Sequence, residues 1–145
     1  MDELINDYLI KITGKQIVDG EEDVVEVETT GHYEESGNEK RIYYKEYIEG
    51  EGCESERDSI VKIEGDNLIT IIRDGEYQSR LMLERNCRHQ CLYKTPYGDM
   101  MIKIYTSVME IDVDCGGGTV KAAYSLNFNG DVGSENEFTI ELKKL

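Results

Sequence analysis

Apolar and polar residues alternate with a period of two along almost the whole chain, and this pattern restricts the fold more than any other feature. Near the N-terminus Ile10 and Ile12 alternate with Lys11 and Thr13. The same alternation recurs in the segments containing Val25 to Tyr33, Val61 and Ile63, Leu81 and Leu83, Met100 to Ile104, Val120 to Phe128, and Phe138 to Leu142. Successive side chains of a strand point to opposite faces, so the pattern predicts half-buried antiparallel strands, and no segment has the period of an amphipathic helix.

Short runs rich in glycine, asparagine and aspartate separate these segments, as tight turns require. They are "ESGNEK" (35–40), "EGDN" (64–67), "RDGE" (73–76), "TPYG" (95–98), "CGGG" (115–118) and "NGDVGSEN" (129–136). The count predicts about ten strands, and an antiparallel sheet of that size closes into a barrel or splits into a sandwich. We therefore expect an all-β fold, a single closed or nearly closed antiparallel barrel of about 8–10 strands, with residues 1–145 forming one domain.

The only proline of the chain, Pro96, lies between two alternating segments. With Pro96 at the second position of a β-turn and Gly98 at the fourth, the run predicts a type I turn at a hairpin tip. Beyond Thr106 the apolar residues shift from even to odd positions, beginning at Met109. One extra residue near Ser107–Val108 would cause this shift, which predicts a β-bulge that bends a long strand at a barrel corner.

The charge of the chain restricts its partners. Its 31 acidic and 16 basic residues give a formal net charge of −15. This charge opposes phosphate backbones and anionic membrane surfaces, so nucleic acid and membranes are excluded as partners, while a basic protein partner remains open. The first residues, "MDELINDYLI", lack the pattern of a signal peptide, and no apolar run approaches the ~20 residues of a membrane span. We expect a cytoplasmic protein whose four cysteines are reduced.

The run "CRHQC" places His89 between Cys87 and Cys91, residue types that bind zinc. In a strand the two cysteines would lie ~13 Å apart, too far for a shared metal or a disulfide. The glycines at 116–118 precede no helix and predict a flexible hairpin loop, and the acidic runs lack the spacing of a calcium loop. No cofactor motif or nucleophile–base arrangement occurs, so the sequence predicts no metal, no cofactor and no catalytic residue.

The segment "RIYYKEYIEG" raises the question of a buried charge. If Tyr44 faces the barrel interior, period two places Glu46 there as well, whereas the opposite phase places Lys45 inside. A buried carboxylate needs a partner, and Arg73 is a candidate. A two-residue loop at 65–66 would send Arg73 outward, and a bulged hairpin would turn it inward.

Four segments together resemble the YwiB-like family of small bacterial proteins. They are "YYKEY" (43–47), "SIVKIEGDNLITIIRDG" (59–75), "TPYGDMMIKIYT" (95–106) and "VKAAYSLNFNG" (120–130). The resemblance implies a closed β-barrel of the calycin, or lipocalin-like, type and implies no activity. In the family pattern the characteristic positions are Tyr44, Glu46, Arg73, Gly98 and Thr106.

Three functions follow for a barrel of this kind, and an enzyme is the least favoured of them because no nucleophile–base arrangement occurs. The first is binding of a small amphipathic ligand in the interior. Its candidate residues are Tyr44, Glu46, Arg73, His89, Tyr93, Thr106 and Tyr124. The second is a protein interaction module, with a packed barrel and an acidic binding surface. A void of a few hundred Å³ with mixed polar and apolar lining would favour the ligand, and a filled core would favour the surface.

Overall fold

The computed structural model describes residues 6–50, 53–73, 79–95, 98–128 and 131–145, without the side chains at 46–50, 53–57, 79, 91–95, 128 and 131–132. These residues form ten strands and no helix. The strands are β1 (Tyr8–Val18), β2 (Glu21–Ser36), β3 (Glu39–Gly50), β4 (Cys53–Glu64), β5 (Leu68–Arg73), β6 (Ser79–Glu84), β7 (Arg88–Thr95), β8 (Gly98–Asp114), β9 (Gly117–Phe128) and β10 (Asp131–Lys144).

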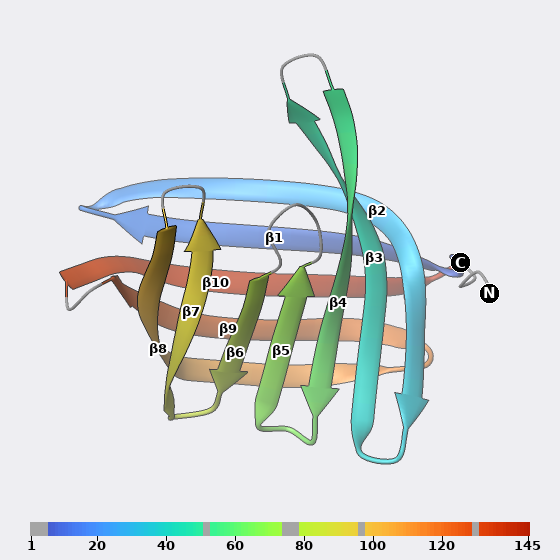
Figure 1. Cartoon of the computed structure of the whole chain (residues 1–145). Coiled ribbons are helices and arrows are strands. Elements are labelled where there is room, and N and C mark those ends of the chain that lie inside the picture. The colour runs from blue at the N-terminus through green and yellow to red at the C-terminus, as the bar shows by residue number, and fades with distance from the viewer. Residues whose placement is uncertain (1–5, 51–52, 74–78, 96–97, 129–130) are drawn as a thin grey trace.

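All ten strands belong to one sheet, in the order β6-β5-β4-β3-β2-β1-β10-β9-β8-β7. Figure 1 shows the sheet curled into two layers, with β1, β9 and β10 behind and β3 to β7 in front. The terminal strands β6 and β7 meet at the turn between them, where the amide of Asn86 donates to the carbonyl of Thr106 at 2.8 Å. The amide of Thr106 donates to the carbonyl of Cys87 at 3.4 Å. The predicted all-β, nearly closed antiparallel barrel is confirmed.

Two long strands, β2 and β8, form the corners at which the sheet passes from one layer to the other. In β2, Gly31 pairs with Tyr8 of β1 and with Tyr44 of β3. A Cβ atom on Gly31 would lie 2.1 Å from the backbone oxygen of Tyr43, so the corner requires glycine. In β8 the register shifts between Thr106 and Val108, which confirms the predicted bulge.

The barrel interior is packed in one half and open at the other end. The packed half contains one cluster of buried apolar side chains, and those with no exposure include Ile10, Ile42, Val61, Ile63, Ile69, Leu83, Val120, Ala122 and Ile140. At the open end Gly14, Gln16 and Val25 continue the interior-facing series of β1 and β2. Gln16 is exposed, Val25 is 64% exposed, and a Cβ on Gly14 would meet no atom within 4 Å. Val25 was expected to be half-buried, but β3 leaves β2 at Gly31 and does not cover it.

Two of the predicted turns differ in extent from the sequence expectation. Thr95 pairs with Gly98, as expected for a hairpin around Pro96. Residues 96–97 themselves lie outside the described residues, and so do residues 74–78 and 129–130 of two other predicted turns. In "CGGG" the turn is Cys115–Gly116 alone, and Gly117 and Gly118 already belong to β9. In "NGDVGSEN" strand β10 begins at Asp131, with a bulge between Val132 and Ser134.

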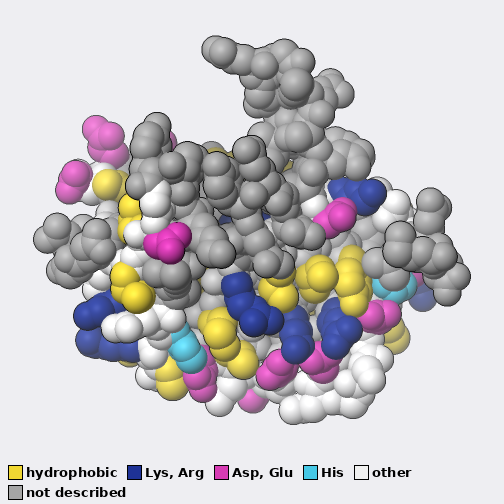
Figure 2. Space-filling model, viewed as in Figure 1, with side chains coloured by type: hydrophobic (Ala, Val, Ile, Leu, Met, Phe, Trp, Pro, Cys, Tyr) yellow, Lys and Arg dark blue, Asp and Glu magenta, His cyan; other side chains and the backbone are white. Residues whose placement is uncertain are grey.

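Ion pairs within and between strands lie on the outer face. Figure 2 shows basic and acidic side chains next to one another on the front layer. Lys62 Nζ lies 3.2 Å from Glu39 Oε1 and 3.1 Å from Glu64 Oε1, and Lys11 Nζ lies 2.6 Å from Glu26 Oε1. Each of these pairs is solvated, so the buried apolar face supplies most of the stability.

Candidate functional site

A row of three polar residues crosses the interior face of the front layer, at the end where β5 stops. Tyr44 of β3 is opposite Ser59 of β4, and Ser59 is opposite Arg73 of β5. Tyr44 and Ser59 are buried, and Arg73 is half-buried with its Nε atom shielded from solvent. At ~4.8 Å between neighbouring strands, the backbones of Tyr44 and Arg73 lie ~10 Å apart. The row therefore brings two of the predicted site residues to one place.

The β4–β5 hairpin determines the direction of Arg73. Glu64 pairs with Leu68, so three residues, Gly65 to Asn67, connect the strands. This longer connection places Ile69, Ile71 and Arg73 on one face, the face that carries the apolar core. Of the two alternatives left open by the sequence, the structure has the inward one.

The hydroxyl group of Ser59 is buried and finds no hydrogen-bond partner among the described residues. A buried polar atom without a partner costs ~1–3 kcal/mol of folding free energy. Sites of this kind need an explanation such as a bound water, an ion or a ligand. Ser59 and Arg73 are directly opposite each other, so this hydroxyl and the guanidinium occupy adjacent positions on the interior face.

Two of the predicted site residues have side chains outside the described residues. These are Glu46 in β3, whose backbone pairs with that of Arg57, and Tyr93 in β7, whose backbone pairs with that of Met100. The contact between Glu46 and Arg73 therefore remains a prediction.

Thr106 and Tyr124 form a second polar group on the interior face of the back layer. They are directly opposite each other in β8 and β9, and Tyr124 is in turn opposite Asn136 of β10. Thr106 has no exposure, and its hydroxyl finds no partner among the described residues. The side-chain Nδ2 of Asn136 donates to Ser134 Oγ at 2.8 Å. Because the backbone of Thr106 also joins β8 to the β6–β7 turn, this residue serves barrel closure first.

His89 is next to a carboxylate of β6. It lies in β7 opposite Ile104, and its Nε2 atom is 2.7 Å from Glu84 Oε1. Cys87 precedes the strand, and the side chain of Cys91 lies outside the described residues. Within the described part of the chain, no three His, Cys, Asp or Glu side chains are placed to hold a metal ion.

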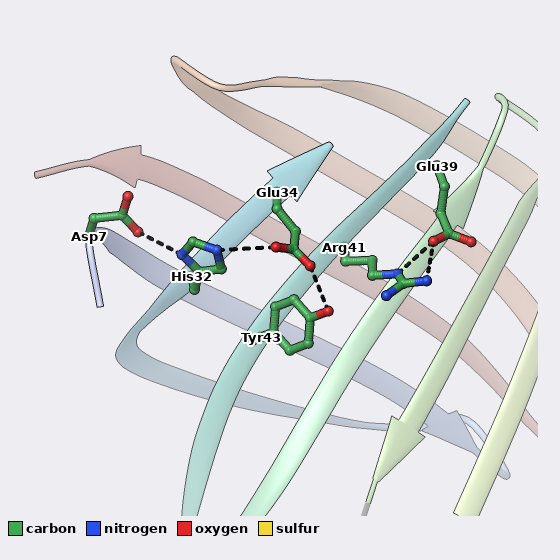
Figure 3. Close-up of polar contacts among 6 residues, drawn as sticks. All are labelled: Asp7, His32, Glu34, Glu39, Arg41 and Tyr43. Carbon is green, nitrogen blue, oxygen red and sulfur yellow. Dashed lines mark hydrogen bonds and ion pairs between the residues drawn. The ribbon is translucent and has the colours of Figure 1, made fainter. Parts of the chain in front are cut away.

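A hydrogen-bonded array on the outer face of β2 and β3 was missed by the sequence analysis (Figure 3). His32 Nδ1 lies 3.3 Å from Asp7 Oδ1, and His32 Nε2 lies 3.6 Å from Glu34 Oε2. The hydroxyl of Tyr43 donates to Glu34 Oε1 at 2.9 Å. All four groups are at least partly solvated, so the array lies on the surface and not in a buried site. Only the register of β2 with β3 brings these residues together, so no sequence motif indicates the array.

Burial also perturbs two tyrosines next to the corner at Gly31. The rings of Tyr8 and Tyr33 meet edge to face, with their centres 5.7 Å apart. Burial is the largest cause that raises the pKa of Tyr33, and its hydrogen bond to Glu35 is the second. Burial is also the largest cause that raises the pKa of Tyr8, and the charge of Asp7 is the second. The Tyr8 hydroxyl donates to the carbonyl of Cys115. Both phenols therefore stay protonated and structural at neutral pH.

Two clefts of about 370 and 470 Å³ open on the outer face where β8 bends. They share Tyr105 and Ser125, and the guanidinium carbon of Arg88 lies 5.5 Å from the ring centre of Tyr105. These clefts are not the interior void that a ligand-binding barrel would contain. No sequence feature indicated them, because the residues that line them come from five different strands.

Comparison with known proteins identifies the family. The profile of the family described as "Domain of unknown function (DUF1934)" matches residues 10–140. The chain belongs to this family. The crystal structure of the ywiB protein from Bacillus subtilis is similar to the DUF1934 chain, with a TM-score of 0.77 and 18% identity, over 97% of this chain and 92% of that one. This likeness shows the fold, in agreement with the resemblance noted in the sequence. No curated protein matches the chain.

Membership of the DUF1934 family assigns no activity and no ligand to the chain, so the function has to be argued from its side chains. The features available are the open barrel end at Gly14 and Val25, the polar row of Tyr44, Ser59 and Arg73, the outer clefts at Tyr105, and the array around His32. Across the described residues there is also no helix with the length and apolar character to cross a membrane.

Proposed function

We propose that the open end of the barrel binds a small amphipathic ligand that carries an anionic group. The observation that carries this proposal is the set of interior-facing positions that stay uncovered there. Gly14 and Gln16 face open space, and Val25, on the same face, is 64% exposed. Binding would cover this apolar surface, and apolar burial contributes roughly 25 cal/mol per Å².

The polar row supports an anionic group on the ligand. The guanidinium of Arg73 presents a planar fork of donors that matches a carboxylate or a phosphate. The buried hydroxyl of Ser59 lies on the neighbouring strand and can donate to the same group. Since the other half of the barrel is filled by side chains, the ligand has to be small and confined to this end. The calycin-like classification implied by the family resemblance is part of the same proposal.

The alternative function is a protein interaction module that acts through its acidic outer surface. The packed half of the barrel supports it, because a filled core leaves the surface as the place for recognition. The two functions make different predictions for molecules that remain bound during purification, and only the ligand-binding function requires one.

Native mass spectrometry of untagged protein, purified without denaturation, tests the ligand. The wild type should carry an additional mass of a few hundred daltons, and Arg73→Leu should lose it. Arg73→Lys keeps the charge without the planar fork and should retain less than the wild type. Arg41→Leu is the matched control, because Arg41 lies on the outer face beside Glu39 and its removal should leave retention unchanged. A wild type without any retained molecule, or equal loss in the Arg41 variant, would contradict the proposal.

A further inference from the structure

Along the first ten residues of β2, 21–30, one edge of the sheet pairs with no other described strand. On one side they pair with β1, from Val18 opposite Glu21 to Tyr8 opposite Gly31. On the other side the pairing with β3 begins only at Gly31. The hydroxyl of Thr29 still reaches the carbonyl of Lys45 at 3.3 Å, where β3 turns away. Among the described residues no strand pairs with this second edge, and Figure 1 shows it along the border of the back layer.

Acidic and exposed apolar side chains occupy this edge. Val24 and Val25 are 57% and 64% exposed and lie on opposite faces of the strand. The carboxylates are Glu21, Glu22, Asp23, Glu26 and Glu28. Two lysines of β1 offset part of this charge, with Lys11 at 2.6 Å from Glu26 and Lys15 at 3.5 Å from Glu22. The edge therefore combines unpaired backbone groups, apolar contacts and an excess of negative charge.

The same charges make a second copy of the chain a poor occupant. Antiparallel self-pairing centred between Val24 and Val25 would place Asp23 opposite Glu26 and Glu21 opposite Glu28 of the other copy. Like charges that are directly opposite destabilise a strand pair. Charged edges are a common protection against self-association, and they protect least against a strand of opposite charge.

We propose that residues 21–30 bind an extended basic segment of a partner protein, which adds to the sheet as a further strand. Backbone hydrogen bonds to β2 supply part of the affinity in this mode of binding. Lysine or arginine side chains of the segment face the carboxylates, and apolar residues between them cover Val24 and Val25. This inference rests on the interaction-module function described above and is independent of the ligand at Arg73.

A fluorescently labelled nine-residue peptide of the sequence KKVVKKVVK, capped at both ends, is a suitable probe, because as a strand it carries lysine and valine on both faces. Its binding to the full chain is measured by fluorescence anisotropy at about 50 and about 200 mM NaCl, and should weaken with salt. A control peptide of the same sequence is N-methylated at two consecutive central residues, so it lacks one backbone hydrogen-bond donor on each of its edges. If the peptide binds by strand addition, the N-methylated form should bind at least about tenfold more weakly. Hydrogen exchange should show protection of the backbone amides of 21–30 when the unmodified peptide is bound.

Two charge-matched variants locate the binding surface. The edge variant carries Glu21→Lys, Asp23→Lys and Glu28→Lys, and should lose at least about tenfold in affinity. The control carries Asp99→Lys, Glu110→Lys and Asp112→Lys, three exposed acidic residues of β8 away from this edge. It has the same net charge as the edge variant and should bind within about threefold of the wild type.

Each contrary outcome overturns the inference in a distinguishable way. Equal losses in both variants would preserve an acidic interaction module but remove the edge as its site. Equal binding of the N-methylated peptide would remove strand addition. A wild-type dimer that excludes the peptide, observed by light scattering, would assign the edge to a second copy. No binding of any basic peptide would refute the interaction module together with the edge, and would leave the ligand proposal to its own test.

Discussion

Substitution of Gly31 by alanine tests the corner that gives the barrel its shape. An alanine Cβ would lie 2.1 Å from the backbone oxygen of Tyr43 and 2.5 Å from Cδ1 of Ile10. Ordinary contacts of a Cβ atom begin near 3.4 Å, so the nearer atom is more than an ångström too close. The Ile10 side chain can rotate away, but the Tyr43 oxygen belongs to the sheet and moves only if β2 and β3 separate.

The expected cost follows from the rigidity of that oxygen. Overpacking a core typically costs ~1–3 kcal/mol, and a clash with backbone belongs at the upper end, about 3 kcal/mol. A domain of this size has a free energy of unfolding of ~5–15 kcal/mol. At ~2–4 °C for each kcal/mol, the melting temperature of Gly31→Ala should fall by roughly 6–12 °C.

Urea unfolding followed by far-ultraviolet circular dichroism measures this loss, with Gly14→Ala as the matched control. Gly14 also lies in a strand next to β2, yet its Cβ would meet nothing within 4 Å. It should be unchanged or stabilised by ~0.4–1 kcal/mol, because alanine restricts the unfolded chain. Adding Ile10→Val to Gly31→Ala should recover only part of the loss. If Gly31→Ala were as stable as Gly14→Ala, the close approach at the corner would be wrong.

Three further predictions concern single side chains. Thr106→Val should leave the melting temperature unchanged or raise it, because it removes a buried hydroxyl without a partner among the described residues; a clear decrease would indicate a hydrogen bond, for example to a buried water. Burial acts to raise the pKa of Glu39, but hydrogen bonds from Lys62 and Arg41 outweigh it and hold that pKa below its usual value. The contribution of Glu39 to stability is therefore complete above its unfolded pKa of about 4.3, and it is lost as the pH falls through its folded pKa. Between about pH 6 and pH 3, Glu39→Gln should therefore lose less stability than the wild type. Urea titrations across this pH range measure the difference. Elemental analysis of untagged protein should find no stoichiometric zinc, and zinc that Cys91→Ser abolished would contradict the spacing argument.

The strands and their faces could be predicted because alternation is a local property of the sequence. Phe138, Ile140 and Leu142 are buried as expected, and the phase shift after Thr106 located the bulge to within a residue. The turn at Asp19–Gly20 was not among the predicted turns, although an Asp-Gly pair is a strong hairpin signal and both residues have positive φ angles.

The remaining features depend on which strand lies beside which, and no local pattern contains that information. Val25 belongs to the predicted apolar face but is exposed, because β3 departs at Gly31 before it can cover this position. The direction of Arg73 depended on the length of one connection, and two lengths agreed equally well with the sequence. The array at His32 needs β3 and the N-terminal residues on either side of β2, which only the register reveals.

The position of Gly31 within β2 links both proposals to the same physical cause. The strand pairs with β1 along its first eleven residues, and its pairing with β3 begins at Gly31, where a Cβ atom would clash with the backbone oxygen of Tyr43. Since Gly31 follows ten residues of β2, those ten residues keep one edge uncovered, and their interior face forms the open end of the barrel. A corner placed closer to Glu21 would extend the pairing with β3 and remove both features at once. The corner leaves this edge without a neighbouring strand. The acidic side chains of the segment then oppose pairing between the edges of two copies of the chain.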